Sequence, residues 1–217
     1  MKKGIFMPGR LESKRLPNKL ILPIGKTNLW EIACKKLSKV SDDFEKVVLV
    51  SKEDEILAKI AKKYKLKIIY RDPETTKIDN PIHQVFKDIK QMESDIIMFL
   101  NPCLLFLRKE SIEYAFNCVT SERPFLESVK RFNSWLYDAN GRLITDLDRK
   151  SMNTKFIEEY YEPAHAFRIF DKNIFFETGQ MSSDIPQLYE LSSEDCTDVD
   201  TKEDFEFARW KYENKKQ

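Results

Sequence analysis

The sequence predicts an α/β fold, in which helices cover both faces of a sheet. Short, continuous apolar runs such as residues 4–7 and 95–100 are typical of strands that are buried on both sides. Segments with apolar residues at helical spacing, such as residues 29–40, lie between these runs. Strands that alternate with amphipathic helices form crossover units, so the alternation places the chain in the α/β class.

The first half of the chain alternates regularly. Its opening strand stops at Pro8, and a polar loop leads to the first helix. In order, the expected elements are strand 4–7, helix 29–40, strand 45–50, helix 53–64, strand 66–70, helix 82–92, strand 95–100 and a helix that begins at 111–116. The buried face expected for helix 53–64 consists of Ile56, Leu57, Ile60 and Ala61.

The second half is less regular. Asp138-Ala-Asn-Gly141 carries the Asn-Gly signal of a hairpin turn, Gly179 is placed to end a helix, and Thr201 with Asp204 predicts a helix cap. The expected elements are strands 125–132 and 135–137, a charged excursion over 145–162, strand 166–170, helix 172–178, strand 188–191 and helix 203–212. We find no repeat or linker, and therefore expect a single domain over residues 1–217 with an arm at about 125–165.

Composition excludes several classes of function. The 37 basic and 36 acidic residues give a net charge of +1, which argues against a general nucleic-acid-binding protein, because such proteins carry a large basic excess. Only 5 of the 217 residues are Gly, and neither G-x-x-x-x-G-K-[ST] nor G-x-G-x-x-G occurs. No run approaches the ~20 apolar residues of a membrane span, and the apolar start is too short for a signal peptide.

The cysteines indicate a compartment. They are far apart and form no C-x-x-C pair, so structural thiols of a reduced cytoplasm are the expected interpretation. The four are Cys34, Cys103, Cys118 and Cys196. The chain is therefore expected to be cytoplasmic, with no membrane partner.

A basic loop follows the first strand. Residues 8–19 include Arg10, Lys14, Arg15 and Lys19, and a proline lies near each end. Loops after the carboxyl ends of strands are where α/β folds bind phosphates, and a mixture of Arg and Lys suits a triphosphate. The alternative is a basic surface loop without a function.

Five segments resemble motifs of the cytidylyltransferases that activate acidic sugars, the CMP-sialic acid and CMP-KDO synthetase group. In chain order they are Met7-Pro-Gly-Arg-Leu-Glu-Ser-Lys-Arg-Leu-Pro-Asn-Lys-Leu-Ile-Leu-Pro-Ile-Gly25, Arg71-Asp-Pro73, Leu100-Asn-Pro-Cys-Leu-Leu-Phe-Leu-Arg108, Phe175-Phe-Glu-Thr-Gly179 and Asp198-Val-Asp-Thr-Lys-Glu-Asp-Phe205. In that family a P-A-R-x-G-S-K-R-L-P-x-K-x-L loop wraps the triphosphate of CTP. The segments extend along nearly the whole chain, and their shared order makes the resemblance specific.

The resemblance implies a three-layer, Rossmann-like nucleotidyltransferase fold with a mostly parallel mixed sheet and a small dimerisation excursion. It implies a homodimeric enzyme that uses Mg²⁺ to transfer CMP from CTP to an acidic sugar. The nucleotide-binding residues are then Pro8, Gly9, Arg10, Ser13, Lys14, Lys19, Arg71 and Asn101. The catalytic residues are Arg10, Lys19 and Asp200, and the substrate-binding residues are His165 and Arg168.

Asp198 and Asp200 are candidate metal ligands. Because they are two residues apart, both carboxylates would lie on one face of an extended strand, where their oxygens could hold Mg²⁺. The alternative is that this acidic segment is simply the solvated start of the last helix, favoured by the helix dipole. The resemblance implies that the two residues carry the metal.

The chain departs from the family pattern at several positions. Glu12 stands where the family usually has Gly beside the triphosphate, so its carboxylate must turn outward or pair with Lys14 or Arg15. Gly9 replaces the usual Ala, and Asn101 replaces the usual Gln. Other changes fall on the acceptor side. Two alternatives therefore stay open: a related nucleotidyltransferase with another acceptor, such as a phosphorylated small molecule, and a paralogue that binds nucleotide without turnover.

Overall fold

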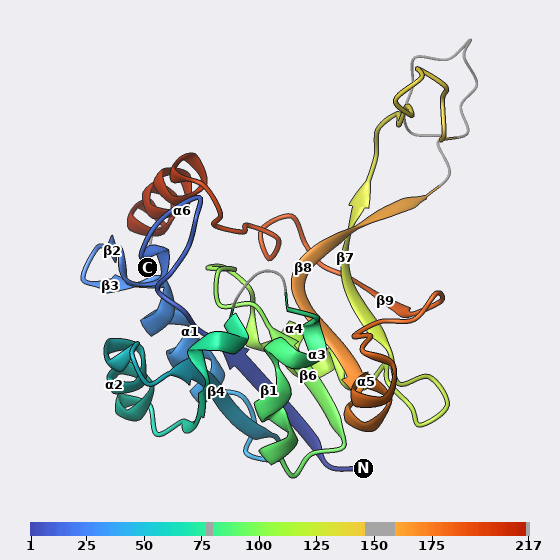
Figure 1. The fold of residues 1–217 in the computed structure, drawn as a ribbon. Helices are drawn as coiled ribbons and strands as arrows, with labels where there is room; N and C mark the ends of the chain where they lie inside the picture. Colours follow the sequence, from blue (N-terminus) through green and yellow to red (C-terminus); the bar gives the residue numbers. More distant parts are fainter. Residues whose placement is uncertain (77–79, 146–158, 216–217) are drawn as a thin grey trace.

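A computed structural model describes residues 1–76, 80–145 and 159–215, and within them a seven-stranded sheet forms the centre of the fold (Figure 1). The strand order is β5-β4-β1-β6-β8-β7-β9. The strands are β1 Lys3–Pro8, β4 Glu45–Ser51, β5 Lys67–Arg71, β6 Ile96–Leu100, β7 Leu126–Phe132, β8 Tyr160–Asp171 and β9 Gln187–Glu190. Two short strands, β2 Pro23–Ile24 and β3 Thr27–Asn28, pair separately.

The sheet is mixed but mostly parallel, as predicted. β1 pairs in parallel with β4 and β6, β4 with β5, and β7 with β9. β8 alone among these strands runs against its neighbours, β6 and β7. The carboxyl ends of the parallel strands therefore meet at one edge of the sheet, where α/β proteins place their ligands.

Helices cover both faces of the sheet. The α-helices are α1 Leu29–Ser38, α2 Glu55–Lys63, α3 Ile82–Val85, α4 Lys109–Ala115, α5 Lys172–Thr178 and α6 Lys202–Asn214, and the 3₁₀ helices are η1 Lys19–Ile21, η2 Pro73–Thr76 and η3 Lys87–Gln91. One buried cluster joins the sheet to α1, α2, α4 and α6. A second, rich in phenylalanine, joins the other face to η3 and α5. Alternate residues of β1 enter the two clusters, Ile5 the first and Phe6 the second, so the sheet is the middle of three layers.

The structure confirms several helix-cap and turn signals of the sequence. Thr201 and Asp204 form a reciprocal capping box at the start of α6. Gly179 adopts a left-handed conformation, φ +76°, and closes α5. The turn at residues 138–141 forms, with Gly141 at φ +79°. No helix within the described ranges combines the length and the apolar character required to cross a membrane.

Some predicted elements were wrong in kind or extent. Residues 82–92 are not one helix: α3 ends after one turn and η3 follows. Phe86, at the break, leaves helical geometry (φ −112°) and lies buried against the sheet together with Ile89. Ile56 is 45% exposed, because α2 turns the small side chain of Ala58 toward the core instead.

The second half of the chain also departs from the predicted elements. Residues 135–137 contribute only an isolated bridge between Tyr137 and Leu143 instead of a strand. β8 begins at Tyr160, six residues before the predicted start and inside the predicted arm. Much of that arm is therefore sheet, since β7 and β8 pair along its base and continue together past the body of the molecule (Figure 1). Residues 146–158 of the arm lie outside the described residues, and the single-domain count stays a prediction.

Candidate active site

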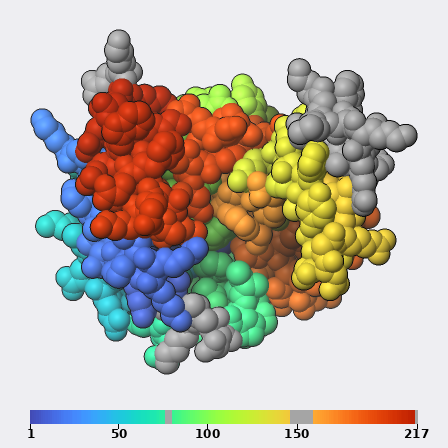
Figure 2. Space-filling view, turned by 90° about the horizontal axis from the view of Figure 1, so that it is seen from above, coloured from blue at the N-terminus to red at the C-terminus, as the bar shows by residue number. Residues whose placement is uncertain are grey.

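A cavity of about 640 Å³ opens at the carboxyl edge of the sheet. Figure 2 looks down on this edge, where the loop after β1 lies against the C-terminal segment. The predicted nucleotide-binding residues Pro8, Gly9, Arg10, Ser13, Lys14, Lys19, Arg71 and Asn101 all line the cavity, together with Asp200. The fold thus brings residues from both ends of the sequence to one place.

The loop after β1 starts at a close contact between Gly9 and Trp30. A Cβ atom on Gly9 would lie 2.7 Å from a ring carbon of Trp30, which is fully buried in α1. The Gly9 amide donates to Leu49 O of β4 at 2.9 Å, and its carbonyl accepts from Arg71 Nη2 at 3.0 Å. Gly9 therefore replaces the family's usual Ala because Trp30 occupies the space of a side chain.

Arg71 serves both the loop and the cavity. Its side chain is buried, and its Nε has no hydrogen-bond partner within the described structure. Burial, with the nearby charge of Arg10, lowers the pKa of Arg71 to about 10. A buried guanidinium with an unused donor at a cavity wall can serve as a ligand-binding group.

The far end of the loop folds back on itself and presents Lys19. Asn18 adopts a left-handed conformation, φ +57°, and its amide donates to Leu11 O at 3.1 Å. Lys19 Nζ then donates to Val199 O at 2.9 Å and to Asp200 Oδ1 at 2.8 Å. Burial alone would lower the pKa of Lys19, but the Cys103 sulfur and the Asp200 carboxylate outweigh it, so the pKa is raised. Lys19 is consequently a fixed positive charge.

Asp200 holds a second basic residue of the loop. Arg15 Nη2 lies 2.9 Å from Asp200 Oδ2, so both carboxylate oxygens face basic groups. The Asp200 backbone amide donates to Asp204 in the cap of α6. The sequence alone does not reveal that Asp200 pairs with Arg15 and Lys19, because these opposite charges are far apart in the chain.

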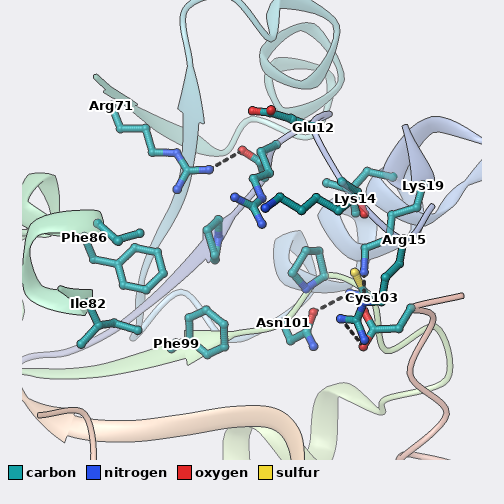
Figure 3. A pocket seen from close by; sticks show the side chains of 18 of the residues that line it. Glu12, Lys14, Arg15, Lys19, Arg71, Ile82, Phe86, Phe99, Asn101 and Cys103 are labelled. Atoms are coloured by element: carbon teal, nitrogen blue, oxygen red, sulfur yellow. Dashed lines mark hydrogen bonds and ion pairs between the residues drawn. The ribbon is translucent and has the colours of Figure 1, made fainter. Parts of the chain in front are cut away.

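Glu12 lines both this cavity and a smaller neighbouring cavity of about 290 Å³. Figure 3 shows its carboxylate on the opposite side of the loop from Phe99 and Asn101. It forms no ion pair with Lys14, and Arg15 is engaged by Asp200. Glu12 instead faces Asp54, whose pKa is raised by burial and by the charges of Glu53 and Glu12. The carboxylate is therefore accommodated by its direction and not by an ion pair with Lys14 or Arg15, although Glu12 still borders the cavity.

Asp198 lies beside the cavity without lining it. Its backbone bridges to Leu104, and the side chain borders a neighbouring cavity of about 740 Å³. Its Oδ1 is buried without a hydrogen-bond partner, and burial followed by the charge of Asp200 raises its pKa. Within the described ranges, no three His, Cys, Asp or Glu side chains are placed to hold a metal ion together. The metal site therefore stays a prediction: of its two predicted ligands, Asp198 has a buried oxygen without a partner, whereas both carboxylate oxygens of Asp200 contact basic groups.

The two predicted substrate-binding residues lie outside the cavity. Arg168 Nε donates to the buried Glu127 at 2.6 Å, which engages the guanidinium within the sheet. His165 is exposed on β8 with φ +53°, and it lies close enough to Asp198 to lower the pKa of that carboxyl slightly against the effect of burial. The structure thus brings His165, but not Arg168, near the acidic segment.

Sequence reasoning missed the apolar wall of the cavity. Ile82, Phe86 and Phe99 line the side below Arg71, opposite the basic loop (Figure 3), and Val85 also lines the cavity. No local pattern in the sequence marks this wall, because the fold alone brings residues 82–86 together with Phe99. Cys103 also lines the cavity, but burial raises the pKa of its thiol to about 11, so it is not an activated nucleophile.

Comparisons with known proteins agree with this geometry. A sequence profile of the cytidylyltransferase family matches residues 5–209, whereas no curated protein matches the sequence. A CMP:2-keto-3-deoxy-manno-octonic acid synthetase, solved in complex with CTP, is similar with a TM-score of 0.75 and 13% identity over 100% of both chains. The 4-diphosphocytidyl-2C-methyl-D-erythritol synthase of Anaerococcus prevotii DSM 20548 has a TM-score of 0.71 and 14% identity, over 98% of this chain and 96% of its own.

A cytidylyltransferase from Leptospira borgpetersenii has a TM-score of 0.61 and 18% identity, over 96% of this chain and 85% of its own. At these identities the solved structures establish the fold. The family profile does more, because it covers nearly the whole chain and includes the basic loop, Arg71, Asn101 and Asp200. The chain belongs to the cytidylyltransferase family and is a CTP-dependent nucleotidyltransferase.

Proposed function

We propose that this cytidylyltransferase transfers CMP from CTP to a hydroxyl of an acidic sugar, such as sialic acid, another nonulosonic acid or a KDO-like acid, and releases pyrophosphate. The observation that carries the proposal is the cavity in which the basic loop after β1 meets Asp200. A triphosphate requires such a cluster of cationic donors, and the five family motifs of the sequence resemble the group with acidic sugar acceptors.

The two sides of the cavity suggest how CTP would lie. The base would occupy the side lined by Phe86 and Phe99 beneath Arg71, where flat apolar surface adjoins an unused donor. The triphosphate would lie along the loop, toward Arg10, Lys14 and Lys19. Because Arg71 also donates to Gly9 O, a shift of Arg71 when the base binds would move the start of the loop.

The acidic segment fits a magnesium ion. Asp198 offers a buried oxygen without a partner, and the charge of Asp200 acts on it directly. Mg²⁺ prefers oxygen ligands and is commonly held by one or two carboxylates together with substrate phosphates and water. When bound, the ion would neutralise charge on the phosphates.

The transfer itself demands little covalent work from the protein. An acceptor hydroxyl oxygen bonds to the α-phosphorus in line, the bond from that phosphorus to the bridging oxygen breaks, the hydroxyl proton leaves to water, and pyrophosphate departs. Lys19, fixed by Asp200 and Val199, and Arg10, which lines the same cavity, would hold the phosphates and stabilise the developing charge. Positioning and preorganised charge lower the barrier.

The test is magnesium-dependent pyrophosphate release by the variants Asp200→Ala and Lys19→Ala. Each is expected to lose at least about 100-fold in kcat while keeping a folded circular-dichroism spectrum. Lys26→Ala is the matched control, because Lys26 is an exposed lysine of the β2–β3 turn and does not line the cavity. Full turnover by either site variant would refute the assignment.

A different acceptor is the second candidate. It is supported by the similarity to the A. prevotii 4-diphosphocytidyl-2C-methyl-D-erythritol synthase and by Arg168, which is bound to Glu127 instead of facing the cavity. A panel of acid sugars and phosphorylated polyols, scored by pyrophosphate release, distinguishes the two. Calorimetry with CTP and Mg²⁺ tests the third reading, a paralogue that binds nucleotide without turnover.

We also propose a homodimer in which the arm at about 125–165 contacts the second subunit. The extension of β7 and β8 past the body of the sheet supports it (Figure 1). Light scattering of the full chain, compared with a variant that lacks residues 146–158, would test this assembly. A monomeric full chain would contradict it.

A further inference from the structure

β7 and β8 lose their regular register close to the site. Glu127 of β7 pairs with Arg168 of β8, but Val129, two residues on, pairs with Pro163. Four residues of β8 therefore lie opposite the single residue Ser128. Such a bulge bends the strand and leaves backbone groups without their usual ladder partners.

The side chain of Ser128 satisfies these groups. Ser128 is fully buried, and its Oγ donates to Phe167 O at 2.7 Å and accepts from Phe167 N at 3.0 Å. A hydroxyl can do both, because it carries one donor and two acceptor positions. One side chain thus replaces the two backbone hydrogen bonds that a regular strand pair would supply.

The bulge carries residues of the site on its other side. His165 lies in it with φ +53°, a conformation uncommon for residues other than glycine and one that surrounding structure must hold. Asn101 binds the bulge twice, through its amide to Ala166 O at 2.9 Å and through Nδ2 to His165 O at 3.1 Å. Ser128 and Asn101 therefore hold the same short segment from opposite strands.

We infer that Ser128 is a positioning residue for the acceptor side of the reaction. It acts through the bulge, which holds His165 in its left-handed conformation and fixes the strand that Asn101 contacts at the cavity wall. Among the predicted nucleotide-binding residues, only Asn101 is hydrogen-bonded to the bulge in the described structure. The inference rests on the proposed function, and it requires that Ser128 affect acceptor binding more than CTP binding.

The kinetic test uses Ser128→Ala in the full chain. Loss of the hydroxyl leaves two buried backbone groups unsatisfied, and we expect KM for the acid sugar to rise about 10-fold while the calorimetric Kd for CTP stays within about twofold. Ser128→Thr, which keeps a hydroxyl, should restore KM. Ser94→Ala is the matched control: Ser94 is also buried, but its Oγ donates to Glu45 at the opposite edge of the sheet.

Two results would overturn the inference. One is a KM for the acceptor that is the same in Ser128→Ala and Ser94→Ala. The other is an equal loss of CTP affinity, which would mean that the hydroxyl supports the whole site. Failure of Ser128→Thr to restore KM would count against it as well, provided that this variant melts at the wild-type temperature.

Hydrogen exchange tests the inference without an acceptor and so separates it from the proposed function. In Ser128→Ala the amides of Phe167 and Asn101 should exchange at least about 10-fold faster, whereas amides of β1 and β4 should not change. If the wild type releases no pyrophosphate with any acid sugar, the proposed function fails, but this measurement still decides whether Ser128 holds the bulge. Unchanged protection of both amides would overturn the inference.

Discussion

Gly9→Ala tests whether Trp30 shapes the start of the nucleotide loop. The new Cβ would lie 2.7 and 2.8 Å from two ring carbons of Trp30 and 3.2 Å from Leu57 Cδ1. Trp30 cannot easily tilt away, because it is fully buried and its Nε1 donates to Leu57 O at 2.9 Å. The strain therefore has to be relieved by movement of the loop or the indole.

The expected magnitude follows from the packing. Overpacking of a filled core costs about 1–3 kcal/mol, of which the lower entropy of the unfolded alanine chain returns about 0.4–1 kcal/mol. The net cost is then about 0.6–2.6 kcal/mol, and for a chain of this length the midpoint of thermal unfolding should fall by about 1–10 °C. Because Gly9 O accepts from Arg71, a displaced loop should also weaken CTP binding by about 10-fold, measured by calorimetry.

A double-mutant cycle with Trp30→Phe isolates the contact. Phenylalanine removes the ring carbons that Gly9 approaches, so Gly9→Ala should be neutral or stabilising in that background. The coupling free energy should be about 1–3 kcal/mol. If Gly9→Ala costs as much beside Phe as beside Trp, or does not destabilise the wild type at all, the contact does not explain why this chain has glycine there.

Three further predictions concern charged groups. Lys36 donates to two backbone carbonyls after β6, and burial lowers its pKa to about 8. Between pH 8 and 10.5 the unfolded chain binds more protons than the folded chain, so the free energy of unfolding of the wild type should rise with pH by up to about 3 kcal/mol relative to Lys36→Met. Urea unfolding measures this difference, and parallel curves for the two proteins would contradict it. Asp198→Asn should raise the melting temperature, because it removes a buried charge beside Asp200, and should abolish pyrophosphate release; an unchanged rate would exclude Asp198 as a metal ligand. Arg71→Lys keeps the charge but loses the planar fork, so Kd for CTP should rise about 10-fold with little change in kcat, and unchanged calorimetric affinity would argue against a base contact.

The sequence was sufficient to predict the parallel strands β1, β4 and β6 because each contains a continuous apolar run. It was also sufficient for the caps at Thr201 and Gly179, since both depend on residues adjacent in the chain. It was insufficient at residues 82–92, where helical spacing is present but burial of Phe86 against the sheet breaks the helix. Tertiary packing decided that segment, and no local pattern records it.

The sequence likewise predicted one part of the candidate site but not the contacts that fix it. The loop of residues 8–19 is contiguous, so its basic residues were identifiable before any fold was known. The partners that fix it are not: Trp30 packs on Gly9, Arg71 binds its carbonyl, and Asp200 binds Lys19 from the other end of the chain. Each of these contacts exists only because neighbouring strands bring distant segments to one edge of the sheet.

The proposed acceptor side depends on contacts between three separate strands, and this arrangement affects acceptor specificity. Its candidate residues lie on β8, with His165 in the bulge shaped by Ser128 on β7 and Asn101 after β6, and Arg168 just beyond that bulge. A change at any of these positions moves a shared backbone, while the loop that faces the triphosphate is anchored separately to β4, β5 and Asp200. The proposed acceptor site therefore predicts that substitutions in β7 and β8 change acceptor preference more than they change CTP binding, so that one nucleotide site could serve acceptors of different chemistry.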